Sequence, residues 1–366
     1  MSESSSVTSL AEEPEVLTAE KPSSPSLGSE QLTTRGRMGK VAGVRVLATG
    51  SYVPETIVTN EDLAELGCDS DWIVRRTGIL RRRRGSDDEA TSDMCYEAAI
   101  RCMEEANVSA DQIDLIIVAT ITPDHPTPST ACHVQRRLGA VAPAMDVNAA
   151  CAGFMYAYTT AAQFIAAGNA KCALVIGADM MSRTVNPKDV KTYPLFGDAA
   201  GAVLLTGTEA DDPAGILSYQ IGSEGCGGEM LCIPAGGSRQ PLTPDAHAGG
   251  QQYLTMDGRN VFKWAVRVFG ESAKDVLADA NVRSKELQLV VLHQANQRII
   301  DSAVSDLDVS PEKVFVNLNE YGNTSGASIP LALDEAVRAG KVGRGDYVLM
   351  CGFGAGLAWG TALLRW

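Results

Sequence analysis

The stretch that decides the fold is AMDVNAACAGF, residues 144–154. It begins with strand-forming residues, carries one cysteine and continues into the small, apolar segment 152–167, which predicts a helix ending at Gly168. Cys151 would then lie at or just before the first helical turn, where free N–H groups and the helix dipole favour a thiolate. The stretch alone fits a buried structural cysteine as well as a nucleophile.

Apolar runs of strand length flank this stretch and alternate with segments of helical periodicity. Strands are predicted at 41–49, 114–122, 171–178, 199–206, 287–292, 313–318, 346–351 and 360–364. Helices are predicted at 60–65, 91–105, 129–138, 258–280, 295–306 and 327–339. The run DLIIVATIT lacks polar alternation, which is typical of strands buried on both faces of a parallel sheet. The pattern predicts an α/β protein.

Three strand sequences recur in order along the chain. LIIVAT at 115 corresponds to LVVLHQ at 289, ALVIGA at 173 to VLMCGF at 348, and AVLLTG at 202 to TALLRW at 361. A repeated βα unit predicts two pseudo-symmetric halves, with sheets that share helices and with functional groups where the halves meet. The alternative is two unrelated α/β segments, because strand cores carry little sequence information.

The repeat divides the chain into an N-terminal half at 41–215, which carries Cys151, and a C-terminal half at 216–366. Residues 1–40 are rich in Ser, Glu and Pro, and we predict a disordered extension. A transit peptide is an alternative reading, but such peptides lack acidic residues. Another alternative is that translation of the protein starts at Met38.

The composition excludes several classes of protein. The formal net charge of -14 argues against nucleic acid and anionic membrane as partners. Nine cysteines without a C-x-x-C pair predict reduced thiols in the cytoplasm and no zinc or other metal site. Apolar runs are of strand length, so no transmembrane helix is expected.

Polar side chains follow three of the buried strands, which is where open α/β folds place their sites. They are Cys151, His293 directly after the strand at 287–292, and Asn323 in the small polar loop YGNTSGAS. The glycine loop 352–356 follows another strand and offers unobstructed backbone N–H groups. The structural alternatives are that His293 is a core histidine and that Asn323 caps a helix.

Together these groups predict acyl-transfer chemistry. A thiolate attacks an acyl thioester, and the N–H groups of Cys151 and Gly356 form the oxyanion hole. A histidine and an asparagine that donate to one carbonyl stabilise an enolate, which suits decarboxylation followed by carbon–carbon bond formation.

The motifs resemble those of the β-ketoacyl-acyl-carrier-protein synthase III family, which belongs to the thiolase-fold condensing enzymes. The matching stretches are NAACAGF, HQANQRII, GNTSGASIP, GFGAGLAWG and SDWIVRRTGI, in family order across roughly residues 41–366. The resemblance implies a duplicated, five-layered αβαβα fold and a homodimer. It also implies Cys151 as the nucleophile, and His293 and Asn323 as the residues that promote decarboxylation.

The resemblance further implies binding residues for coenzyme A and the acyl carrier protein. Trp72 and Arg76 match the pair that holds the adenine end of coenzyme A, and Arg298 matches a basic contact for the carrier. The residues near the pantetheine tunnel are Asn296, Met256 and Gly258.

Two positions depart from the family pattern. Ser305 and Asp306 replace paired lysines, so the carrier-docking patch is expected to be weaker or shifted. Thr127 replaces a bulky phenylalanine before Pro128, which leaves the acyl primer open. The basic cluster formed by Arg81–Arg84 with Arg75 and Arg76 is interpreted either as a landing site for coenzyme A or the carrier, or as a solvated strand edge.

The predicted function is the decarboxylating Claisen condensation of an acyl-coenzyme A, acetyl-coenzyme A or a similar primer, with malonyl-acyl carrier protein, which initiates fatty-acid synthesis. No metal or redox cofactor is expected. The alternative is a secondary-metabolite condensing enzyme or acyltransferase of the same fold. A papain-type hydrolase and a non-catalytic carrier-binding protein fit the motifs less well.

Overall fold

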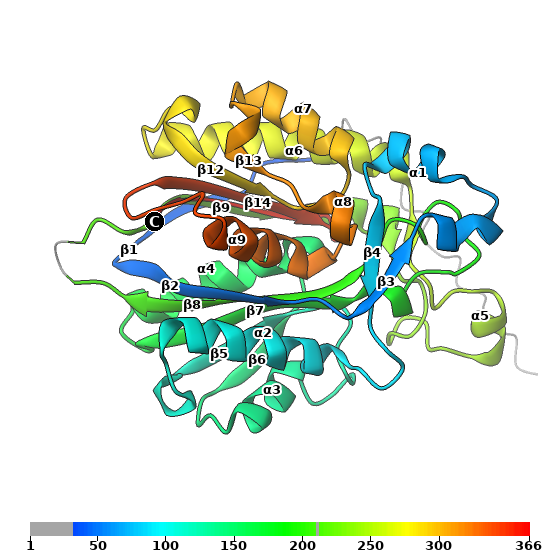
Figure 1. The fold of residues 1–366 in the computed structure, drawn as a ribbon, viewed down its shortest axis with the longest axis horizontal. Helices are drawn as coiled ribbons and strands as arrows, with labels where there is room; N and C mark the ends of the chain where they lie inside the picture. The colour runs from blue at the N-terminus through cyan, green and yellow to red at the C-terminus, as the bar shows by residue number, and fades with distance from the viewer. Residues whose placement is uncertain (1–31, 210–211) are drawn as a thin grey trace, which may run out of the picture.

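The computed structural model describes residues 32–209 and 212–366, and these residues form five stacked layers (Figure 1). Two sheets lie one above the other, with helices between them and on both outer faces. From one outer face to the other, the helices are α2 (Thr91–Ala106) with α3 (Thr130–Leu138), α4 (Gly153–Ala166) with α9 (Ser328–Arg338), and α6 (Gly258–Asp279) with α7 (Gln297–Leu307). The predicted αβαβα fold is therefore confirmed.

The first sheet has five strands in the order β2-β8-β7-β5-β6. They are β2 (Val44–Tyr52), β5 (Leu115–Ala119), β6 (Ala144–Val147), β7 (Cys172–Met180) and β8 (Asp198–Gly207). β5 is parallel to β6 and β7, whereas β8 is antiparallel to β7 and β2. The carboxyl ends of β5, β6 and β7 therefore meet at one edge, and Cys151 follows β6 there.

The second sheet has six strands in the order β1-β9-β15-β14-β12-β13. They are β1 (Arg37–Ala42), β9 (Gly215–Ser223), β12 (Leu287–Leu292), β13 (Val314–Phe315), β14 (Tyr347–Gly354) and β15 (Ala358–Arg365). Its last five strands repeat the order and the strand directions of the first sheet. The strands matched by sequence, β5 with β12, β7 with β14 and β8 with β15, occupy equivalent places, which confirms the duplication.

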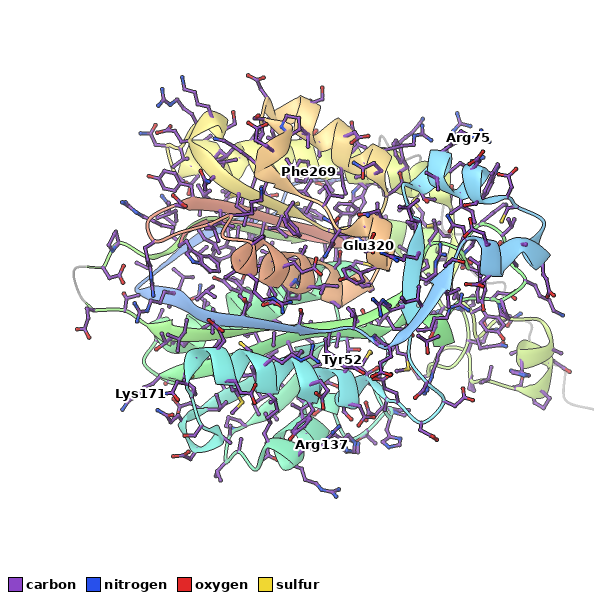
Figure 2. All side chains as sticks on the ribbon, viewed as in Figure 1. Tyr52, Arg75, Arg137, Lys171, Phe269 and Glu320 are labelled. Atoms are coloured by element: carbon purple, nitrogen blue, oxygen red, sulfur yellow. The ribbon has the colours of Figure 1, made fainter. Side chains whose placement is uncertain are left out.

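Smaller elements lie outside the two large sheets. They are the pairs β3 (Thr56–Thr59) with β4 (Arg81–Arg84) and β10 (Leu231–Cys232) with β11 (Thr255–Met256), and the helices α1 (Ser70–Thr77), α5 (Pro244–Ala248) and α8 (Leu318–Tyr321). Figure 2 shows Arg75 of α1 at the periphery, whereas Phe269 of α6 lies over the second sheet and is buried. No helix in the described part of the chain is long and apolar enough to span a membrane.

The central helix α4 explains why the segment after Cys151 consists of small residues. Ala157, Ala161 and Ala162 are fully buried where α4 packs between the two sheets. Because interiors are close-packed, small side chains let a helix fit between two sheets without voids or clashes. Phe154 and Tyr158 fill the remaining space and contact each other at a centroid distance of 5.9 Å.

Three predictions of local structure need correction. Residues 1–31 of the predicted disordered extension lie outside the described residues, but 37–40 belong to β1, whose backbone pairs with β9. The strand predicted at 313–318 shrinks to β13, because α8 begins at Leu318. The strand β9 was not predicted, since its sequence GILSYQIGS mixes polar and glycine residues into the apolar run.

Within the basic run Arg81–Arg84, Arg82 is not accessible as part of the predicted landing site. Arg82 is fully buried, and its guanidinium donates to the Val58 carbonyl oxygen at 3.1 Å, to Asn60 Oδ1 at 2.9 Å and to the Pro194 carbonyl oxygen at 2.7 Å. Burial lowers its pKa to about 10. Arg84 lies over the Tyr193 ring, and Arg81 pairs with Glu320. The cluster therefore serves the fold.

We expect Arg82→Met to lower the free energy of unfolding by about 3 kcal/mol, because it leaves the buried acceptors of the guanidinium unpaired. Urea unfolding of the full chain measures this. Arg81→Met is the matched control and should cost less than about 1 kcal/mol, since its ion pair with Glu320 is partly exposed. Equal losses in the two variants would contradict the structural role of Arg82.

Candidate active site

Cys151 lies in a tight turn between a strand and a helix. β6 ends at Val147, a 3₁₀ turn covers Ala150–Ala152, and α4 begins at Gly153. Ala150 has a φ of 48°, a left-handed conformation that is uncommon for a residue with a side chain. The turn directs Cys151 toward the C-terminal half, where its side chain is 8% exposed.

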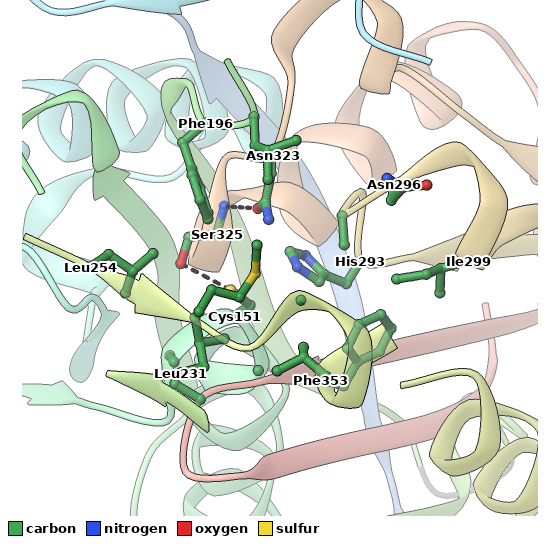
Figure 3. A pocket seen from close by; sticks show the side chains of 18 of the residues that line it. Cys151, Phe196, Leu231, Leu254, His293, Asn296, Ile299, Asn323, Ser325 and Phe353 are labelled. Carbon is green, nitrogen blue, oxygen red and sulfur yellow. Dashed lines mark hydrogen bonds between the residues drawn. The ribbon is translucent and has the colours of Figure 1, made fainter. Parts of the chain in front are cut away.

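One pocket brings together the three side chains that the sequence singled out (Figure 3). Cys151, His293 and Asn323 all line it, and they come from three different loops. The N–H of His293 donates to the Cys351 carbonyl oxygen at 2.8 Å, which fixes the start of its loop to β14. The N–H of Asn323 donates to the Leu195 carbonyl oxygen at 2.8 Å, so this loop is anchored to the other half.

The amide of Asn323 is oriented by its own loop. Its Oδ1 accepts a hydrogen bond of 2.9 Å from the backbone N–H of Ser325. Because an amide carries its acceptor and its donors on opposite sides, this contact turns the Nδ2 donors toward Cys151 and His293, as Figure 3 shows. Asn323 can thus donate to a carbonyl bound in the pocket.

The two halves contribute equivalent turns to the site. The 3₁₀ turn Ser325–Ala327 precedes α9 as the turn at Cys151 precedes α4, and Ser325 has a φ of 51°, close to the 48° of Ala150. The two turns meet directly, since Cys151 Sγ lies 3.3 Å from Ser325 Oγ. Ser325 was missed by the sequence reasoning although it lies in the quoted YGNTSGAS loop.

Asp179 is a second residue that the sequence reasoning missed. Its buried carboxylate accepts hydrogen bonds from the N–H of Gly326 at 2.8 Å, the N–H of Ile121 at 2.7 Å and Thr120 Oγ1 at 3.0 Å. Burial raises its pKa, and these hydrogen bonds oppose the rise. Asp179 therefore ties the end of β7 to the turn that holds Ser325. Its place at the end of a buried strand was the available signal.

The electrostatics of the site differ from the expected thiolate. Burial raises the pKa of the Cys151 thiol to about 12, and the hydrogen bond with Ser325 only partly opposes this. Burial also lowers the pKa of His293 to about 3. Burial of both groups thus favours a neutral thiol beside a neutral imidazole at rest.

The glycine loop approaches Cys151 closely. A Cβ on Gly354 would lie 2.7 Å from the backbone nitrogen of Cys151, so only glycine permits this contact. Gly354 and Ala355 line the pocket. Gly356, the predicted oxyanion donor, is not among the lining residues, and its carbonyl oxygen lies near Gly228. Ala355, which does line the pocket, is the alternative second donor.

The remaining predicted binding residues fall into two groups. Met256, Gly258 and Asn296 line the pocket. Trp72, Arg76 and Arg298 do not, although Arg76 and Arg298 each contact a residue that does. Asn296 Nδ2 donates to the Arg76 carbonyl oxygen at 3.0 Å, and the Arg76 guanidinium lies 4.9 Å from the centre of the Trp72 ring. Arg298 is exposed and lies 5.4 Å from the centre of the Phe262 ring.

The pocket is apolar on both sides of Cys151 (Figure 3). On one side the walls are Ile121, Met181, Leu195, Phe196, Leu231 and Leu254. The other large apolar lining residues are Val261, Phe262, Trp264, Ile299 and Phe353, of which the last four pack in one cluster. No cluster of three or more His, Cys, Asp or Glu side chains that could hold a metal ion occurs within residues 32–209 and 212–366.

Two family models match this chain. One is described as 3-oxoacyl-[acyl-carrier-protein (ACP)] synthase III and matches residues 145–225. The other is described as the C-terminal part of the same enzyme and matches residues 277–366. The first match contains Cys151, and the second contains His293 and Asn323.

Individual relatives match almost the whole chain. A protein of Rhodopirellula baltica named beta-ketoacyl-[acyl-carrier-protein] synthase III is 72% identical over 345 residues, which cover 90% of this chain and 100% of the relative. The crystal structure of 3-oxoacyl-[acyl-carrier-protein] synthase III from Aquifex aeolicus has a TM-score of 0.81 at 44% identity, covering 88% of this chain and 100% of that one. The priming beta-ketosynthase from the R1128 polyketide biosynthetic pathway has a TM-score of 0.82 at 36% identity, covering 90% of this chain and 98% of that one.

Proposed function

The chain belongs to the beta-ketoacyl-[acyl-carrier-protein] synthase III family, and we propose that Cys151, His293 and Asn323 perform its condensation reaction. The enzyme is an acyltransferase that initiates fatty-acid synthesis by joining an acyl-coenzyme A to malonyl-acyl carrier protein with loss of CO₂. The observation that carries the assignment of residues is their convergence from both halves on one pocket.

In the first step, the sulfur of Cys151 attacks the thioester carbonyl of the acyl-coenzyme A. The oxyanion that forms accepts hydrogen bonds from the N–H groups of Cys151 and Ala355. The carbon–sulfur bond to coenzyme A then breaks, and the proton of the Cys151 thiol ends on the departing coenzyme A sulfur. Because the thiol is buried and neutral at rest, this proton must leave as the new bond forms.

In the second step, malonyl-acyl carrier protein replaces coenzyme A. His293 and Asn323 each donate an N–H to the malonyl thioester carbonyl, so negative charge gathers on that oxygen as CO₂ leaves. The resulting carbanion attacks the acyl group on Cys151 to give 3-oxoacyl-acyl carrier protein, and the thiolate takes one proton from solvent. A neutral imidazole suits this role, because His293 needs to donate and not to carry charge.

The pocket supports an uncharged, apolar primer. The wall beside Cys151 formed by Ile121, Met181, Phe196, Leu231 and Leu254 offers an acyl chain no charged partner. Acetyl-coenzyme A and longer or branched acyl esters fit this chemistry, while a carboxylated primer would be buried without a counter-charge. The likeness to a polyketide priming ketosynthase keeps a secondary-metabolite role as the second candidate.

We further propose a cytoplasmic homodimer that works without metal or organic cofactor. β6 is one of the two edge strands of the first sheet, and an unpaired edge is suited to pairing with a second copy. The nearby side chain of Val141 is 93% exposed, which also favours a contact surface there. All nine cysteines are free thiols, as a reducing compartment requires.

The test is reconstitution of the full reaction. The purified chain, a panel of acyl-coenzyme A esters and malonyl-acyl carrier protein should yield 3-oxoacyl-acyl carrier protein and one CO₂ for each product. Apolar esters should react, and succinyl-coenzyme A should not. Hydrolysis of the thioesters without condensation would contradict the proposal.

A further inference from the structure

Residues 32–36, here called the strap, pack against the back of the active-site wall. They precede β1 and fall outside both regions that the family models match. Leu32 is only 3% exposed and belongs to an apolar cluster with Trp264, Phe353 and Leu357. Trp264 and Phe353 also line the pocket. The strap thus belongs to the apolar cluster that also supplies part of the cavity wall.

Polar contacts fix the strap at Leu32 and at the two residues that follow it. The backbone N–H of Thr33 donates to Glu224 Oε2 at 2.9 Å. The Leu32 carbonyl oxygen accepts from Arg267 of α6, and Thr34 Oγ1 donates to Glu271 of the same helix. These contacts join the strap to Glu224 and to helix α6, so residues 32–34 are held on the folded part of the chain.

Glu224 connects the strap to the glycine loop through hydrogen bonds with Leu357. Its backbone N–H donates to the Leu357 carbonyl oxygen at 2.7 Å, and the Leu357 N–H donates back to the Glu224 carbonyl oxygen at 2.9 Å. Leu357 directly follows residues 354–356. Its side chain packs against Gly227 and lies in the same apolar cluster as Leu32. The strap and Glu224 therefore hold one end of the loop from two sides.

We propose that the strap is a positioning element of the oxyanion hole. Leu32 and Thr33 hold Leu357 in place, and Leu357 in turn keeps the N–H of Ala355 directed at the acyl carbonyl on Cys151. Leu32 touches no reacting atom and acts only through the loop. The proposal rests on the proposed function, because it assigns the strap a role in the acylation of Cys151.

The test separates two reactions of the same sulfur in the full-length protein. Acylation by acyl-coenzyme A passes through an oxyanion, whereas alkylation by iodoacetamide is a displacement at a saturated carbon and forms none. Leu32→Ala should lower the acylation rate constant roughly tenfold and leave the affinity for the ester and the alkylation rate nearly unchanged. Leu32→Met, which refills the cluster, should restore acylation.

Leu277→Ala is the matched control. Leu277 is 6% exposed and lies on α6, the helix that the strap contacts, but it packs in a different apolar cluster from Leu32. The Leu277→Ala variant should lose folding stability, as Leu32→Ala does, but should keep the wild-type rate of acylation. Glu224→Gln provides a second variant that keeps the apolar cluster intact. It weakens the contact with Thr33, so it should also slow acylation selectively.

The outcomes are distinct. Selective loss of acylation in Leu32→Ala and Glu224→Gln supports the proposal. Unchanged acylation in both, or acylation and alkylation falling together as Leu32 is truncated, overturns it. If the wild-type protein itself is not acylated by any ester, that result contradicts the proposed function as well as the proposed role of the strap.

Discussion

Cys151→Ala is expected to abolish covalent acylation and to lower the condensation rate by roughly four orders of magnitude or more, as loss of a catalytic nucleophile does. Intact-protein mass spectrometry after mixing with acyl-coenzyme A should show an acyl adduct on the wild type alone. The substitution removes only a sulfur from a site that α4 and both sheets already fix, so the fold should survive.

The same variant should keep one partial reaction. Decarboxylation of malonyl-acyl carrier protein uses the donors of His293 and Asn323, and neither depends on the sulfur of Cys151. Release of CO₂ by Cys151→Ala is therefore expected to persist without 3-oxoacyl product. Cys351→Ala is the matched control, because Cys351 is also fully buried at a strand in the second half but does not line the pocket. An adduct on Cys151→Ala would place the nucleophile elsewhere.

The sequence predicted the parts of the fold that periodicity encodes. Strands such as β5, β7 and β12, which are almost entirely buried, carry long apolar runs, and their recurrence in order revealed the duplication. β9 was missed because it lies between β1 and β15 with several partly exposed positions, so its sequence is mixed. β1 was missed because its residues are mostly exposed, and its stability comes from pairing with β9.

The site was predicted as a set of residues but not as an electrostatic environment. Position after a strand identified Cys151 and His293, and the small polar loop YGNTSGAS identified Asn323, which follows α8 and not a strand. The pKa of Cys151 depends on how completely both halves enclose it, and no local pattern records that burial. Asp179 escaped notice for a related reason, since its partners Ile121 and Gly326 are distant in sequence.

Glycine and arginine motifs were the least informative about position. In the loop GFGAG, the sequence does not tell which amide faces the sulfur, and a shift of one residue moves the predicted donor from Gly356 to Ala355. The run Arg81–Arg84 suggested an anion site, but alternation along β4 buries Arg82 and leaves Arg81 outside. In both cases backbone direction decides the role of a residue.

Asn323→Asp is expected to lower condensation by about a hundredfold to a thousandfold while acylation of Cys151 persists. Aspartate keeps the oxygen that accepts the Ser325 N–H at 2.9 Å, so the loop should retain its shape. It loses the Nδ2 donors and places negative charge where the malonyl oxygen gathers its own. The enolate is therefore destabilised, and release of CO₂ should fall with condensation.

His293→Ala should show the same pattern, because it removes the other donor to the same oxygen. The two substitutions combined should lose less than the product of their single effects if both groups stabilise one enolate. Single-turnover assays that follow the acyl adduct, CO₂ and 3-oxoacyl product separately measure this. Loss of acylation in Asn323→Asp would mean that Asn323 acts on the first step, and the division of labour between the two halves would be wrong. Retained acylation with lost decarboxylation would instead assign the nucleophile to the N-terminal half and the enolate donors to the C-terminal half.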